Sequence, residues 1–107
     1  MRSDILAAEV KLLMTWDIQA GNEEDYFEFV VRDYLPGMQR LGLPVSDAWL
    51  TMYGQRPRVL TEAKMPNLLE MKEVLRNPDW EELTDKLLEY VDNFNYKIVH
   101  ATQGFQM

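Results

Sequence analysis

Asp17 and Glu62 are the residues of this chain whose type and placement best suit acid–base chemistry. Both fall on the mixed faces of stretches that alternate apolar and polar residues, as strands do. Two neighbouring carboxylates repel each other's charge, which raises the pKa of one of them and makes it a general acid or base. The alternative is that each carboxylate pairs with Lys11, Arg58 or Lys64 across the sheet. The sequence leaves both interpretations open.

His100 is the single histidine of the chain and a further candidate for a general base or an axial ligand. Histidine changes its protonation near neutral pH, so it can exchange protons with a substrate. The alternative is a structural residue of the last predicted strand. The absence of cysteine excludes thiolate metal sites and cysteine nucleophiles, and one histidine excludes a two-histidine metal motif. We therefore expect neither a metal nor a cofactor.

An apolar cavity is the third candidate site, because the chain is rich in aromatic residues and methionines. Trp16, Tyr34 and Met52 fall on apolar faces that are expected to converge between helices and sheet, where a flat apolar molecule would fit. Further residues of the same kind are Met14, Tyr26, Phe29, Met71 and Trp80. The alternative is that all of them form an ordinary core, since a domain of this size has few other residues to fill one.

The composition, with 47% hydrophobic and 27% charged residues, is that of one soluble globular domain over residues 1–107. No apolar run approaches the roughly 20 residues that cross a bilayer, and acidic residues interrupt the N-terminal stretch where a signal peptide would be apolar. The net charge of -7 repels phosphate backbones, so nucleic-acid binding is not expected. We expect a cytoplasmic protein that does not enter a membrane.

The first half of the chain predicts a strand followed by a helix. Residues 10–19 alternate strictly between apolar and mixed positions, which is typical of a strand. Asn22 is a candidate N-cap, because three acidic residues follow it and favour the first turn of a helix. Pro36 predicts a kink near residues 32–35, and Gly42 is expected to end the helix.

The middle of the chain predicts a β-hairpin. Residues 47–53 and 58–65 are alternating runs, and they are joined by Gly54-Gln55-Arg56-Pro57, a turn-forming sequence. Pro66 then suits the start of a short helix.

The last part of the chain predicts a second helix and a final strand. Asn77 suits an N-cap, and the proline after it suits the first helical position. The apolar stripe of this helix is expected to continue to Phe94, and residues 96–102 alternate as a strand. The complete order is β-α-β-β-α-β, which predicts an α+β fold.

This element order, together with the run Asn77-Pro78-Asp79-Trp80, resembles the dimeric α+β barrel superfamily, which includes antibiotic-biosynthesis-monooxygenase-like and NIPSNAP-like proteins. The run is similar to the Pro-Glu/Asp-Trp turn between two short helices of many such domains. The resemblance covers residues 10–102. It implies a ferredoxin-like fold with a four-stranded antiparallel sheet of order 4-1-3-2, helices on one face, and a homodimer formed through the other face.

The mixed faces of the predicted strands favour the same homodimer from the residues alone, because they would otherwise leave an apolar patch in water. The expected interface residues are Leu13, Trp49, Tyr53 and Leu60. Two functions follow as hypotheses. The first is a dimeric domain that binds a small apolar or aromatic molecule. The alternative is a cofactor-independent monooxygenase or isomerase that acts on an aromatic or polyketide-like substrate.

Overall fold

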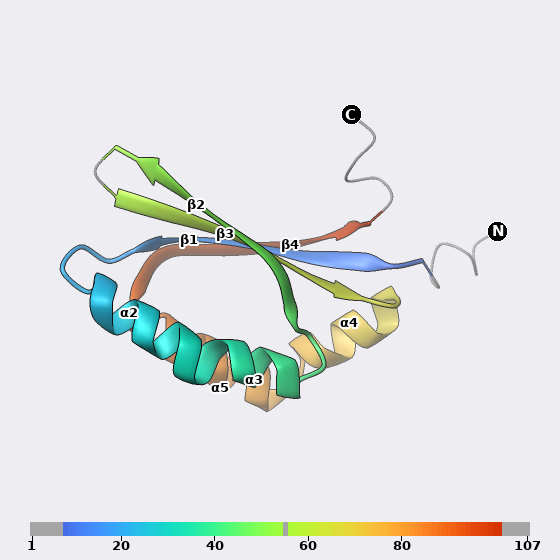
Figure 1. The fold of residues 1–107 in the computed structure, drawn as a ribbon. Coiled ribbons are helices and arrows are strands. Elements are labelled where there is room, and N and C mark those ends of the chain that lie inside the picture. Colours follow the sequence, from blue (N-terminus) through green and yellow to red (C-terminus); the bar gives the residue numbers. More distant parts are fainter. Residues whose placement is uncertain (1–7, 55, 102–107) are drawn as a thin grey trace.

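A four-stranded sheet carries helices on one of its faces (Figure 1). The computed structural model describes residues 8–54 and 56–101, without the side chains of Tyr53 and Arg56. The elements follow in the order β1 (Val10–Ile18), α2 (Glu23–Phe29), the π-helical turn η1 (Val30–Tyr34), α3 (Leu35–Arg40), β2 (Val45–Tyr53), β3 (Arg56–Met65), α4 (Leu68–Leu75), α5 (Pro78–Leu87) and β4 (Val91–His100).

The sheet is antiparallel throughout, with strand order β2-β3-β1-β4. This is the predicted order 4-1-3-2 read from the opposite edge, so the ferredoxin-like α+β fold expected from the sequence is confirmed. Two strands that are adjacent in sequence, β2 and β3, form the hairpin, and β1 lies in the middle between β3 and β4. The connections from β1 to β2 and from β3 to β4 each contain helices, whereas a short turn joins β2 to β3.

The helix-facing side of the sheet forms the core. Leu12, Met14 and Trp16 of β1 are fully buried there, and the residues opposite them on β3 are also buried. Strand residues alternate between the two faces, so the apolar set predicted from the sequence lies against the helices as a group. The largest buried side chains include Trp16 and Tyr34, whose rings meet edge to face with centroids 5.9 Å apart.

The predicted irregularity of the first helix is present as a change of helix type. Pro36 has no N–H and its ring crowds the carbonyl four residues earlier, so regular α-helical bonding cannot pass through this point. The chain widens into the π-helical turn η1 just before it and resumes as α3. Gly42 then ends the helix as predicted, with φ +81 and with the Leu43 N–H donating to the Met38 carbonyl at 2.9 Å.

Asn22 lies at the predicted N-cap position of α2, but its side chain does not cap the helix. Its amide donates instead to Oε1 of Gln19 at 2.8 Å, which ties the loop to the end of β1. The two later helices are capped by side chains: Asn77 accepts from the Asp79 N–H at 2.8 Å, as predicted, and Asn67 accepts from the Glu70 N–H at 2.9 Å. The cap at Asn67 places Pro66 just outside α4.

The prediction for the end of the second helical region was wrong. Helix α5 stops at Leu87, and β4 begins at Val91, five residues before the predicted start of the last strand. Val91 pairs with Ile18, and Phe94 stacks on Trp16 with ring centroids 6.0 Å apart. These apolar residues fit both a helical stripe and a strand face, and pairing with β1 decides in favour of the strand.

Candidate functional site

An apolar cavity lies between the helical layer and the sheet, beside the edge strand β2, and its volume is about 180 Å³. Helices α2 and α3 with η1 supply one wall, and the strands supply the other. The residues that line it are Trp16, Tyr26, Phe27, Val30, Tyr34, Leu35, Val45, Ala48, Trp49, Leu50, Val59 and Thr61. No charged side chain is among them, so the cavity suits an apolar guest.

Hydrogen bonds occupy most of the polar atoms around this cavity. The Trp16 indole Nε1–H donates to the Tyr26 hydroxyl at 2.9 Å. The Tyr34 hydroxyl donates to the Met14 sulfur at 3.5 Å, and Thr61 Oγ1 donates to the Met14 carbonyl oxygen at the same distance. Burial raises the pKa of both tyrosines above its ordinary value, because removal from water disfavours the tyrosinate. Both phenols are therefore neutral at physiological pH.

The cavity includes two of the three ligand-binding residues predicted from the sequence. Trp16 and Tyr34 line it, but Met52 does not. Met52 lies opposite Pro57 near the tip of the hairpin, where the two strands extend beyond the helices, and its side chain is 64% exposed (Figure 1). Alternation placed Met52 on the helix-facing side correctly, but among the described residues no helix reaches that far along β2 (Figure 1).

Several lining residues were not recognised from the sequence, because the cavity wall depends on how strands pair. Val59 and Thr61 lie directly opposite Trp16 and Met14, which brings them into the wall. Phe27 and Leu35 of the helices also line the cavity although they are partly exposed, as is Leu50 of β2. The aromatic content alone indicated only that such a site was possible.

The structure does not bring Asp17 and Glu62 together. Asp17 lies opposite Arg58, whereas Glu62 lies opposite Leu13, four residues farther along β1, which corresponds to about 13 Å. Asp17 accepts two hydrogen bonds from Arg58, and Glu62 forms an ion pair with Lys11 at 3.3 Å. The cross-strand pairing considered as the alternative is therefore the arrangement in the molecule.

His100 is also distant from the cavity. It lies opposite Val10 at the end of β4, six residues along β1 from Trp16, or about 20 Å. Over residues 8–54 and 56–101, no group of three or more histidine, aspartate or glutamate side chains could hold a metal ion. Within the same residues, no helix is long and apolar enough to cross a membrane.

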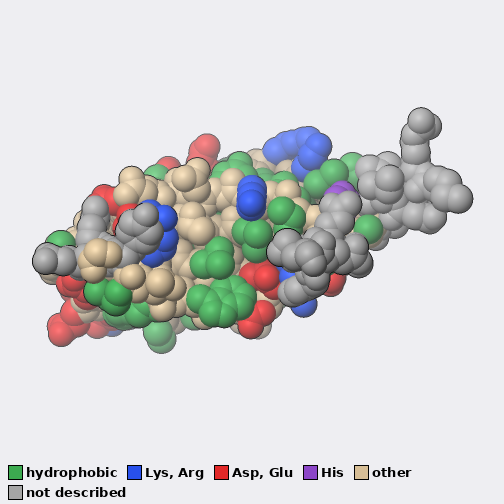
Figure 2. All heavy atoms as spheres, turned by 90° about the horizontal axis from the view of Figure 1, so that it is seen from above, with side chains coloured by type: hydrophobic (Ala, Val, Ile, Leu, Met, Phe, Trp, Pro, Cys, Tyr) green, Lys and Arg blue, Asp and Glu red, His purple; other side chains and the backbone are tan. Residues whose placement is uncertain are grey.

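The face of the sheet opposite the helices carries the predicted interface residues Leu13, Trp49 and Leu60. Figure 2 shows hydrophobic side chains exposed near the middle of this face. Trp49 lies directly opposite Leu60, and their exposed fractions are 48% and 36%. A shallow hollow of about 470 Å³ lies beside them, lined by Leu13, Thr15, Leu60, Asn95, Tyr96 and Lys97. The side chain of the fourth predicted residue, Tyr53, lies outside the described part of the structure.

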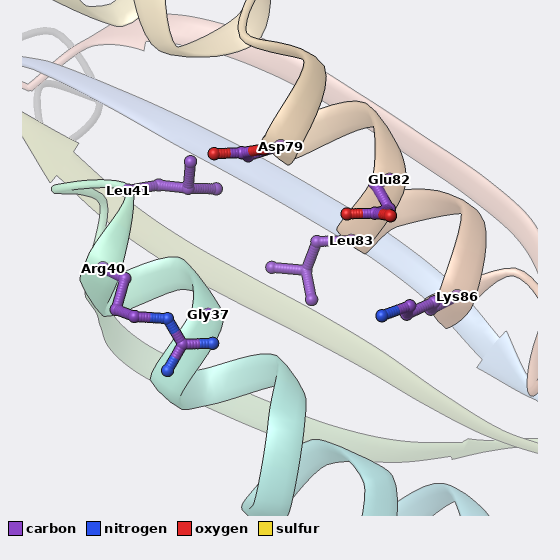
Figure 3. Close-up of a pocket in the computed structure, with 7 residues that line it drawn as sticks. All are labelled: Gly37, Arg40, Leu41, Asp79, Glu82, Leu83 and Lys86. Atoms are coloured by element: carbon purple, nitrogen blue, oxygen red, sulfur yellow. The ribbon is translucent and has the colours of Figure 1, made fainter.

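A second hollow, between α3 and α5, has a charged border (Figure 3). Arg40 comes from α3, and Glu82 and Lys86 come from α5, while Leu83 projects toward Gly37 between the two helices. A Cβ atom at position 37 would lie 2.8 Å from Leu83 Cδ2, so glycine allows the helices to approach closely. Side chains of both charge signs border this hollow, so it favours neither anions nor cations.

By sequence, the chain matches no family model and no curated protein. Its fold matches solved structures. One is a NIPSNAP family protein from Agrobacterium tumefaciens, with 14% identity and a TM-score of 0.68 over 87% of this chain and 85% of the other. Another is an uncharacterized NIPSNAP domain protein from Burkholderia xenovorans, with 13% identity and a TM-score of 0.63 over 84% and 91%.

A third match is SnoaB, a cofactor-independent oxygenase from Streptomyces nogalater, with 16% identity and a TM-score of 0.65 over 94% of this chain and all of the other. This chain has the fold of the NIPSNAP proteins and SnoaB. The resemblance inferred from the element order is therefore confirmed at the level of the fold. Identities of this size establish architecture, and function has to be argued from the site.

Proposed function

We propose that this protein binds a small, flat, apolar molecule in the cavity lined by Trp16 and Tyr34. The observation that supports the proposal is the composition of the wall, which is aromatic and aliphatic and whose side-chain polar groups are all uncharged. An apolar cavity of about 150 Å³ is large enough to hold benzene, so the volume of about 180 Å³ here suits a ring of similar size with a substituent.

The position of the cavity supports the same proposal. It lies at the edge strand β2, and apolar side chains at its rim, such as Phe27 and Leu50, are 46% and 56% exposed. Exposed apolar side chains around a hollow are typical of ligand-binding sites. A guest would cover them and remove their surface from water, which contributes about 25 cal/mol for each Å² buried.

Equilibrium dialysis with a panel of one- and two-ring aromatic compounds tests this function. We expect saturable binding to the wild-type protein and at least tenfold weaker binding after Trp16→Phe or Tyr34→Phe. Met52→Ala is the matched control, because Met52 is apolar and lies two residues from the lining residue Leu50 but does not itself line the cavity. Binding that survives both aromatic substitutions would place the site elsewhere, and an absence of binding across the panel would contradict the proposal.

We also propose that two copies associate through the sheet face that carries Leu13, Trp49 and Leu60. The exposed apolar side chains on this face support the association, since a single copy leaves them in water. An obligate interface typically buries roughly 2,000 Å² or more. Light scattering at low micromolar concentration should give twice the 12.6 kDa mass of one copy. A species of 12.6 kDa alone would contradict the homodimer.

Cofactor-independent oxygenation or isomerisation is the second candidate function, and the likeness in fold to SnoaB favours it. The ligand would then be an aromatic or polyketide-like substrate. Oxygen consumption, measured with hydroxylated naphthalenes and no added cofactor, tests this function directly. A cytoplasmic location stays a prediction, and fractionation of cells that produce the protein tests it.

A further inference from the structure

The donors and acceptors of the cavity do not balance. Four buried side chains in its wall carry hydrogen-bonding atoms: Trp16, Tyr26, Tyr34 and Thr61. The N–H of Trp16 and the hydroxyl protons of Tyr34 and Thr61 each have an acceptor. The Tyr26 hydroxyl oxygen accepts the Trp16 bond, but among the described residues its own proton makes no hydrogen bond.

The Tyr26 hydroxyl already has one hydrogen-bond partner, and a hydroxyl can donate one bond as well as accept, so a bond from its own proton would complete its capacity. Tyr26 is 3% exposed, so bulk water does not readily supply the missing partner. A hydroxyl that already accepts a hydrogen bond is also polarised, which strengthens its own donation. The Trp16–Tyr26 pair therefore presents one strong donor to whatever occupies the cavity.

We propose that Tyr26 is the specificity-determining residue of the cavity and that its hydroxyl donates to an uncharged oxygen acceptor, such as a ketone, on an otherwise apolar ring. This inference rests on the proposed ligand-binding function and names the class of ligand. A carboxylate is disfavoured, because the cavity wall holds no cation to replace the water that a carboxylate would lose.

Three matched compounds test this inference: acetophenone, ethylbenzene and benzoate. They share one ring and differ in the acceptor, which is neutral, absent or charged. Binding is measured from the chemical shift of the Trp16 indole N–H in nitrogen-15 spectra. We expect acetophenone to bind about two- to twelvefold more tightly than ethylbenzene, the range for one net neutral hydrogen bond. Benzoate should bind at least tenfold more weakly than acetophenone.

Tyr26→Phe removes the donor and retains the ring. It should reduce the preference for acetophenone over ethylbenzene, because the hydroxyl that donates to the ketone is gone. The substitution also removes the acceptor of the Trp16 indole N–H, so circular dichroism is used first to check that the variant protein is folded. A second measurement uses the wild-type protein with carbon-13 at tyrosine Cζ, where acetophenone should shift the Tyr26 signal and ethylbenzene should not.

Each outcome separates this inference from the function on which it rests. Equal binding of acetophenone and ethylbenzene to the wild type would overturn the role of Tyr26 and leave the apolar binding site intact. A Tyr26 signal that does not respond to acetophenone, or a ketone preference in Tyr26→Phe equal to that of the wild type, would also overturn the role of Tyr26. Failure of all three compounds to bind would contradict the proposed function itself.

Discussion

Arg58 holds the carboxylate of Asp17 with two hydrogen bonds, from Nε to Oδ1 at 2.8 Å and from Nη2 to Oδ2 at 3.3 Å. The Asn93 side chain donates to the same carboxylate at 2.7 Å, so one aspartate of β1 connects the two neighbouring strands β3 and β4. The Asp17 side chain is 8% exposed, so these partners, rather than water, stabilise its negative charge.

Arg58→Met should lower the free energy of unfolding by about 2 kcal/mol, because it removes the charged partner of a buried carboxylate while keeping an apolar stem. Urea unfolding measures the change. Arg32→Met is the matched control, since the Arg32–Glu28 ion pair on α2 and η1 is exposed and should be worth about 0.5 kcal/mol or less. Equal losses of unfolding free energy in the two variants would show that burial of Asp17 does not strengthen the Asp17–Arg58 pair.

Trp49→Ala should weaken the proposed homodimer at least tenfold, because a large aromatic side chain at the centre of an interface contributes more than its neighbours. Sedimentation equilibrium measures the dissociation constant. Met52→Ala is the control on the same strand: it removes a side chain of similar exposure from the opposite face of β2 and should leave dimerisation unchanged. If both substitutions act alike, the assignment of faces in the dimer is incorrect.

Asn77→Ala should lower the free energy of unfolding by about 1 kcal/mol through loss of the bond to the Asp79 N–H. Asn22→Ala provides a comparison at an equivalent position, since Asn22 makes no side-chain cap bond and should cost less. Thermal unfolding of both variants measures the difference. A larger loss for Asn22→Ala would show that its bond to Gln19 matters more than a helix cap.

The buried tyrosines predict a loss of stability at high pH. Burial raises the pKa of Tyr34 above 10.0, its ordinary value, so the unfolded chain releases this proton at a lower pH than the folded protein does. The contribution of Tyr34 to the free energy of unfolding is fully present below pH 10. Above pH 10 this contribution declines by about 1.4 kcal/mol per pH unit. Urea unfolding on both sides of pH 10 should show this decline, and Tyr34→Phe should make it shallower.

Periodicity by itself predicted the order of strands and helices and the composition of the sheet faces, whereas the order of strands in the sheet followed from the family resemblance. The alternation in β1 and the hairpin predicted which residues face the helices, because successive side chains of a strand point to opposite sides. The cap at Asn77 and the effect of Pro36 were also predictable, since both depend on backbone groups within one turn of the residue.

Tertiary structure decided what short-range patterns leave ambiguous. Val91 and Phe94 fit a helix or a strand equally well, and only pairing with β1 and stacking on Trp16 selects the strand. The same dependence on distant partners governs the site. Met52 lies outside the cavity because the helices end before the hairpin tip, and Tyr26 became a candidate donor only when its contact with Trp16 was visible. Ten residues separate that pair in sequence, and no local pattern encodes a hydrogen bond between a strand and the helix that packs on it.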